Sequence, residues 1–208
     1  MKEIRKVLEG TLYESSLSRV LSWMQKHDCG IVTAARDKIT DKDLSERKVT
    51  NKENILRNKA LKSQIALRYG VTSVEGCFIE NYDTENAVEV GEHVFFVVDM
   101  HEKGDLFETL KKWGKQWNQD SILFIPKGGE KAILYGTNPN SYPGDGKSVE
   151  FKDRMFGVEG EFMTKVRGRP FVFYNKDVIE EIVYTSGYLG KMGAKETYKR
   201  IIKELEEF

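Results

Sequence analysis

Apolar residues recur along this chain at two spacings, one typical of helices and one typical of strands. Repeats of three and four residues predict helices over 15–28, 51–69, 104–117 and 195–208. Short apolar or alternating runs predict strands over 29–35, 71–80, 93–99, 121–125, 132–135, 161–166 and 170–174. The run HVFFVVD at 93–99 is almost wholly apolar, which is typical of a strand covered on both faces.

The segments between these elements predict loops and turns. The charged run 37–50 has no periodicity, and 141–160 carries four glycines, so we expect both to be irregular. The sequence PKGG at 126–129 predicts a hairpin turn, and Gly70 is expected to cap the second helix. Hairpins mixed with helical crossovers indicate the α/β (α+β) class, with a single mixed β-sheet and helices packed on it. We expect residues 1–208 to form one globular domain.

Composition and charge narrow the class of protein. Hydrophobic residues make up 39% of the 208 residues, which is enough to build a core without disulfides. Lys plus Arg equals Asp plus Glu, at 33 each, which argues against a nucleic-acid coat or a membrane-surface protein. A signal-peptide pattern and a long apolar run are both missing, so we expect a cytoplasmic protein without a membrane partner. Cys29 and Cys77 lie in apolar runs and are expected to be buried thiols.

Motifs for well-known chemistries are scarce. The three histidines are scattered and no Cys-x-x-Cys occurs, so we expect no metal site and no cofactor. The sequence GDGKS at 144–148 lacks the first glycine of a phosphate-binding loop. Residues 149–151 that follow it favour a strand over the helix that would hold a phosphate. The sequence therefore leaves open whether the protein is an enzyme.

A set of polar residues lies at one strand exit and on one helix. Arg36 follows the first predicted strand, and Asn54, Arg57 and Asn58 share one face of the second helix by their spacing. Buried amide and guanidinium groups need partners, which Glu80 or a ligand anion could supply. Two interpretations stay open: a structural network that fixes the helix to the sheet, and a ligand site.

A second polar group follows the third predicted helix. Gln119 and Asp120 lie where that helix leads into a strand, and Lys127 lies in the following turn. If the protein catalyses a reaction, Glu80 or Asp120 is the candidate general base. The full set of predicted ligand-binding residues is Arg36, Asn54, Arg57, Asn58, Gln119, Asp120 and Lys127.

Several short motifs point to a sequence family. They are TAAR at 33–36, the pattern N-x-x-R-N that begins at Asn54, and NQDSIL at 118–123. With these motifs the chain resembles, over roughly residues 30–175, an uncharacterised bacterial and tailed-phage family catalogued as a domain of unknown function. The resemblance implies a phage or mobile-element setting, in the cytoplasm of the host cell or in the virion. It implies no activity.

Two functional hypotheses follow from the sequence. The first is a phage-encoded accessory protein that binds a phosphate-bearing ligand, a nucleotide or nucleic acid, beside Arg36, Arg57 and Lys127. The second is a non-catalytic interaction protein, either a virion component or an inhibitor of a host defence protein. An apolar patch for such a protein partner is expected at Tyr184, Tyr188, Leu189 and Met192.

Overall fold

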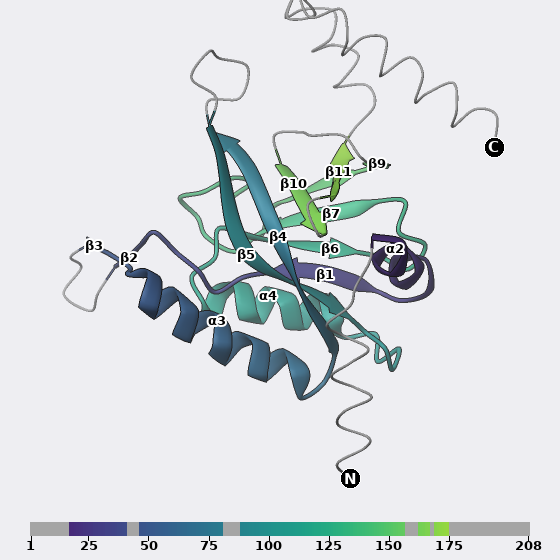
Figure 1. Cartoon of the computed structure of the whole chain (residues 1–208), viewed down its shortest axis with the longest axis horizontal. Coiled ribbons are helices and arrows are strands. Elements are labelled where there is room, and N and C mark those ends of the chain that lie inside the picture. The colour runs from purple at the N-terminus through teal and green to yellow at the C-terminus, as the bar shows by residue number, and fades with distance from the viewer. Residues whose placement is uncertain (1–16, 41–45, 81–87, 157–161, 167–168, 175–208) are drawn as a thin grey trace, which may run out of the picture.

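The structure is a computed structural model that describes residues 17–40, 46–80, 88–156, 162–166 and 169–174 (Figure 1). The helices of this part of the chain are α2 (Leu17–Lys26), α3 (Asn51–Ala66) and α4 (Leu106–Gln116). Its first six strands are β1 (Cys29–Val32), β2 (Lys38–Thr40), β3 (Glu46–Lys48), β4 (Gly70–Glu80), β5 (Val88–Val98) and β6 (Ser121–Ile125). The remaining strands are β7 (Ala132–Gly136), β8 (Ser148–Phe151), β9 (Asp153–Phe156), β10 (Phe162–Val166) and β11 (Arg169–Tyr174).

Nine of the described strands form one sheet, in the order β8-β7-β6-β1-β5-β4-β10-β11-β9. Every pair of neighbours in this sheet is antiparallel, and β2 and β3 pair separately. The predicted α+β class, with helices packed on a single sheet, is confirmed. Neighbouring strands therefore alternate in direction, and the parallel pairs that a mixed sheet would also contain are not found among these pairs.

The central strand β5 is buried on both faces, as its apolar run predicts. Phe95 and Val97 belong to a core cluster on one face, and Val94, Phe96 and Val98 belong to a cluster on the other. Successive side chains of a strand point to opposite faces, so a strand with two cores shows no polar alternation. The sheet is therefore a layer between two separate cores.

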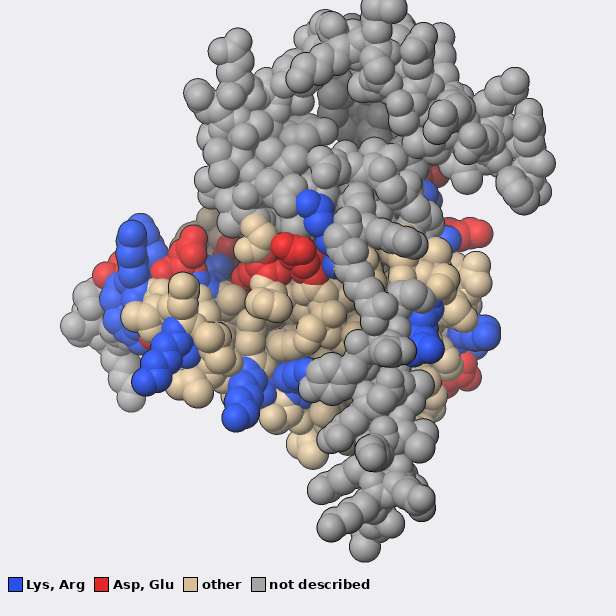
Figure 2. All heavy atoms as spheres, viewed as in Figure 1, with Lys and Arg blue, Asp and Glu red and all other residues tan. Residues whose placement is uncertain are grey.

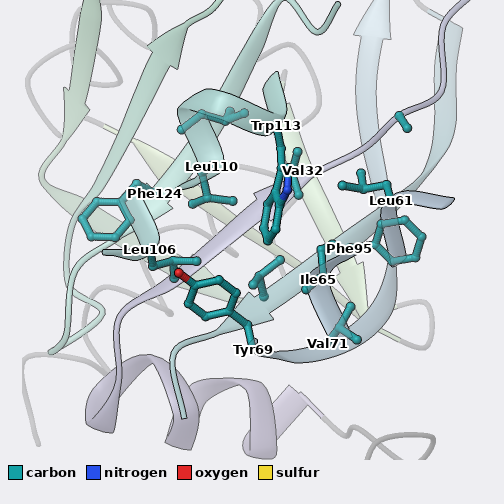
Figure 3. Close-up of a cluster of buried hydrophobic side chains, with 13 residues drawn as sticks. Val32, Leu61, Ile65, Tyr69, Val71, Phe95, Leu106, Leu110, Trp113 and Phe124 are labelled. Atoms are coloured by element: carbon teal, nitrogen blue, oxygen red, sulfur yellow. The ribbon is translucent and has the colours of Figure 1, made fainter. Parts of the chain in front are cut away.

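The first core lies between the sheet and the helices α3 and α4 (Figure 3). Leu106, Leu110 and Trp113 recur at four and three residues along α4, which puts them on one face. Leu61 and Ile65 do the same on α3, and both are fully buried. Burying one such side chain contributes roughly 1.5–3 kcal/mol. This face therefore fixes both helices against β1 and β5.

The second core lies on the opposite face, under α2. Val20 and Met24, one helical turn apart, are the fully buried residues of that helix. They pack with Cys29, with Ile125 and with residues of β10 and β11 such as Phe171. None of the described helices is long and apolar enough to cross a membrane.

Four predictions about local structure need correction or fall outside the described residues. The segment 37–50 contains the hairpin β2–β3, which the sequence does not signal because β3 is exposed throughout and has no buried face. The segment 141–160 contains β8 and β9. Gly70 begins β4, and α3 ends one turn earlier at Leu67, which keeps right-handed helical angles. The predicted helix at 195–208 lies outside the described residues.

Candidate functional site

The chain leaves β1 through residues 33–36, which lie against the polar face of α3. Asn54 binds both backbone groups of Arg36. Its Oδ1 accepts from Arg36 N at 3.0 Å and its Nδ2 donates to Arg36 O at 2.9 Å. Asn58 Oδ1 accepts from Ala34 N at 2.8 Å. Thr33 Oγ1 donates to His93 O at 2.8 Å on the neighbouring strand β5. The exit of β1 is therefore fixed at successive residues.

Arg57 joins this exit segment to the end of α4. Its Nε donates to Ala34 O at 2.7 Å and its Nη2 donates to Trp117 O at 2.8 Å. Its guanidinium also lies over the Trp117 ring, 5.4 Å from the centroid. Burial lowers the pKa of Arg57, and the nearby charge of Glu53 opposes that shift. The guanidinium is thus occupied by backbone carbonyls.

Gln119 completes the support. It is buried, and its Nε2 donates to Ala35 O at 3.1 Å and to Trp117 O at 3.2 Å. Asn118 before it adopts φ 54°, a left-handed conformation that asparagine tolerates and that ends α4. Thr137, the residue after β7, binds the same turn, because its Oγ1 donates to Gln119 O at 2.6 Å. The turn from α4 to β6 is therefore packed directly against the exit of β1.

These supports bring Arg36 and Asp120 together. Arg36 Nη1 lies 2.7 Å from Asp120 Oδ1, and the two side chains are 23% and 45% exposed. The same Oδ1 accepts from Asn138 Nδ2 at 2.9 Å and from Ser141 Oγ at 2.8 Å. Burial works to raise the pKa of Asp120, but the hydrogen bonds from Ser141, Arg36 and Asn138 outweigh it and hold the pKa below its usual value. Asp120 is therefore a carboxylate at neutral pH.

Glu92 on β5 is the second carboxyl group of this region. Burial raises its pKa to about 7, opposed by the charge of Arg36 and reinforced by the charges of Asp37 and Asp120. Glu92 precedes His93, whose backbone O accepts from Thr33 at the exit of β1, so the region combines one ionised carboxyl with one that titrates near neutral pH. We call Arg36, Glu92 and Asp120 the β1-exit cluster.

Sequence reasoning missed Glu92, although a signal was present. Glu92 has the same parity along β5 as Val94 and Phe96, which point into the second core. Glu92 therefore places a carboxyl group where the alternation along the strand predicts an apolar side chain, and such an exception indicates a candidate functional residue. Asn138 and Ser141, which bind Asp120, were also missed because they follow in a later loop whose path the sequence does not reveal.

The other predicted site residues lie elsewhere or are only partly described. Lys127 follows β6 whereas Asp120 precedes it, so the structure places Lys127 outside the cluster, at the other end of that strand. Its Nζ lies 2.7 Å from Glu102 Oε1, and its backbone N donates to Asp28 Oδ1 at 2.8 Å. Glu80 is the last residue of β4, opposite Val88, and its side chain lies outside the described residues.

A shallow hollow of about 210 Å³ lies at the β6–β7 turn, away from the cluster. Ligand pockets usually measure about 300–1,000 Å³, so this hollow is small for a nucleoside. Two of its lysines are engaged with acidic residues, Lys127 with Glu102 at 2.7 Å and Lys131 with Glu150 at 3.6 Å. On the face shown in Figure 2, basic and acidic residues are interspersed and neither forms a broad area. In the described part of the chain, no group of three or more His, Cys, Asp or Glu is placed to hold a metal ion.

Comparison with known families decides the broad class. The model of the S-adenosylmethionine lyase family matches residues 45–172, which is more than half of the chain. This chain belongs to the S-adenosylmethionine lyase family. The matched span contains Glu92 and Asp120, and Arg36 lies shortly before it. No curated protein matches the chain.

Family membership corrects the functional hypotheses drawn from the sequence. A family of lyases is a family of enzymes, which contradicts both the accessory protein that binds a nucleotide or nucleic acid and the non-catalytic virion component or inhibitor. The expectation that the chain falls into a sequence family is confirmed. The family is defined by an activity, however, and the match carries no indication of a phage setting.

Proposed function

We propose that this protein is a lyase that cleaves S-adenosylmethionine. The observation that carries the proposal is the match to the S-adenosylmethionine lyase family over residues 45–172. A lyase breaks a bond without water, and the weak point of this substrate is its positively charged sulfur. The proposed reaction breaks the bond between sulfur and the amino-acid chain. The electron pair stays on sulfur, which leaves as the neutral thioether 5′-methylthioadenosine. Within the amino-acid fragment the carbon is closed in one of two balanced ways. Either an oxygen of its own carboxylate bonds to it and forms a lactone without moving a proton, or a base takes a proton from the neighbouring carbon and a carbon–carbon double bond forms.

We place the reaction at the β1-exit cluster. Glu92 is better suited than Asp120 to take up or release a proton, because a carboxyl with a pKa of about 7 is populated in both forms at neutral pH. Asp120, with its lowered pKa, acts as a fixed negative charge. Arg57, Asn58 and Gln119 position the cluster through backbone contacts and do not touch the substrate. Glu80 stays a second candidate for the base.

The cluster suits a substrate that carries both signs of charge. S-adenosylmethionine has a sulfonium, an ammonium and a carboxylate, and the cluster presents one guanidinium and two carboxyl groups. The carboxyl groups favour a cationic ligand, and the guanidinium favours its carboxylate. Breaking the carbon–sulfur bond removes the positive charge of the sulfonium. Apolar side chains around the sulfur would therefore stabilise the transition state relative to the bound substrate.

Product analysis tests the proposal. Purified protein is incubated with S-adenosylmethionine in water enriched in ¹⁸O, and the products are identified by mass spectrometry at early times. We expect 5′-methylthioadenosine together with an amino-acid fragment that carries no ¹⁸O. An uncleaved substrate would overturn the proposed function, and a fragment that carries ¹⁸O from the first time point would show a hydrolase instead.

A further inference from the structure

The unused hydrogen-bonding capacity of the β1-exit cluster points to one part of the substrate. All three described hydrogen-bond donors to Asp120 converge on Oδ1, so Oδ2 of this half-exposed side chain receives none from the described residues. Arg36 uses Nη1 for Asp120 and its backbone N for Asn54. Its Nε and Nη2 groups bind no described residue. Among the described residues, a carboxylate oxygen without a hydrogen-bond donor therefore lies beside guanidinium N–H groups without an acceptor.

We propose that Arg36 and Asp120 bind the α-amino-acid end of the substrate, and that the site thereby selects adenosyl amino acids over nucleosides that lack this end. The inference rests on the proposed function for the identity of the ligand. An α-amino acid carries a carboxylate and an ammonium on one carbon. The guanidinium fork of Arg36 binds the carboxylate, and Asp120 Oδ2 accepts from the ammonium.

The backbone around the pair is fixed before any ligand arrives. Asn54 holds both the N–H and the C=O of Arg36, so the guanidinium extends from an anchored peptide. Asp120 is anchored on its own backbone, since Thr137 N donates to Asp120 O at 2.9 Å. Gln119 ties the two segments together through Ala35 O. Groups that are already in place bind a ligand without the entropic cost of being ordered.

Glu92 adds a second negative charge near the position of the ammonium. Glu92 precedes His93 on β5, and His93 O accepts from Thr33 Oγ1 at the exit of β1, so Glu92 lies on the strand that borders this segment. A cationic group bound by Asp120 also favours the ionised form of Glu92, because opposite charges stabilise each other. The pair Arg36–Asp120 thus sets the orientation of the amino acid, and Glu92 strengthens the acidic side of the site.

Two unreactive ligands separate the amino-acid end from the rest of the molecule. S-adenosylhomocysteine carries the amino-acid end without the sulfonium, and 5′-methylthioadenosine carries neither. Isothermal titration calorimetry gives the dissociation constant of each ligand. In the wild-type protein we expect S-adenosylhomocysteine to bind at least ~10-fold more tightly, the scale expected for two charge-assisted contacts.

Variants of the pair connect this preference to the proposed residues. In Arg36→Gln and in Asp120→Asn we expect the preference to fall to within about 3-fold, with the affinity for 5′-methylthioadenosine nearly unchanged. Arg36→Lys keeps the charge without the fork, so an intermediate preference is expected. The matched control is Glu102→Gln, because Glu102 forms a 2.7 Å contact with Lys127 at the other end of β6. The control keeps the wild-type preference.

The outcomes of this experiment are distinct from those of the cleavage assay. Equal affinities of the wild-type protein for the two ligands, binding of neither ligand, or a preference that persists in both variants would overturn the inference, even if S-adenosylmethionine is cleaved. A preference that is present in the wild type and lost in folded variants supports it, even if no cleavage occurs. Thermal unfolding of each variant shows that the fold is intact.

Discussion

Arg36 Nη1 lies 2.7 Å from Asp120 Oδ1, which joins the exit of β1 to the residue that precedes β6. The two residues are far apart in the sequence. The contact exists because Arg57 and Gln119 donate hydrogen bonds to backbone carbonyls and thereby join the two segments. Most of the polar side chains of the sequence motifs therefore bind backbone groups. The pair itself keeps atoms that bind none of the described residues, and these are the atoms proposed to bind the ligand.

Replacing Arg57 tests the structural part of this account. Arg57→Ala removes the side-chain donor of Ala34 O and leaves Trp117 O with the weaker contact from Gln119 alone, so we expect the free energy of unfolding to fall by about 2 kcal/mol. Urea denaturation measures the change. The matched control is Arg47→Ala, which removes an exposed ion pair with Glu53 and should cost no more than about 1 kcal/mol. Equal losses in the two variants would show that Arg57 does not support the turn.

The raised pKa of Glu92 predicts that the stability of the protein depends on pH. Its pKa of about 7 in the folded protein lies above the ordinary value of 4.5, so the folded state holds a proton that the unfolded state has lost between these values. Stability from this group is therefore complete below about pH 4.5 and is lost as the pH rises through about 7, by an amount on the order of 2–3 kcal/mol. Denaturation at a series of pH values measures it.

The variant Glu92→Gln isolates that contribution. It removes the titrating group and keeps the shape, so we expect it to be more stable than the wild type at pH 8 and nearly equal at pH 4.5. If catalysis uses Glu92 for proton transfer, the variant also loses the part of the pH–rate profile that changes near pH 7. A stability difference that does not vary with pH would contradict the environment assigned to Glu92.

Gly136, the last residue of β7, allows the following loop to pack closely against the strand. A Cβ at this position would lie 1.9 Å from Gly144 O, a backbone atom that cannot move without displacing the loop that carries Ser141. We expect Gly136→Ala to lose about 2 kcal/mol of stability, and to weaken cleavage because Ser141 no longer holds Asp120. Gly70→Ala is the control, since its Cβ would meet the movable Met100 side chain. If Gly136→Ala cleaves the substrate at the wild-type rate, the loop does not shape the site.

Much of the fold could be predicted from the sequence because burial leaves a periodic pattern. The two-sided burial of β5 and the apolar faces of α3 and α4 are direct consequences of that pattern. The hairpin β2–β3 could not be predicted, because an exposed pair of strands buries nothing and shows no alternation. Which strands become neighbours, such as β1 between β5 and β6, depends on contacts distant in the sequence.

The candidate site was predictable only in part. Residue types and helix spacing pointed to Arg36, Asn54, Arg57 and Asn58 as a group, and the structure brings them together at the exit of β1. Their division into supports and ligand-facing groups depends on which atoms find backbone partners, and no spacing reveals that. Glu92 comes from another strand, and its raised pKa depends on burial that arises only in the folded chain.

The most direct test of the central claim is the rate of S-adenosylmethionine cleavage by three matched proteins. They are the wild type, Asp120→Asn and Glu102→Gln. The two variants each remove a carboxylate that lies 2.7 Å from a cationic side chain, and the two ion pairs lie at opposite ends of β6. We predict cleavage by the wild type and the Glu102 variant at similar kcat/KM, and a loss of at least ~10-fold in the Asp120 variant. Cleavage by Asp120→Asn at the wild-type rate, or no cleavage by the wild type, would contradict the account.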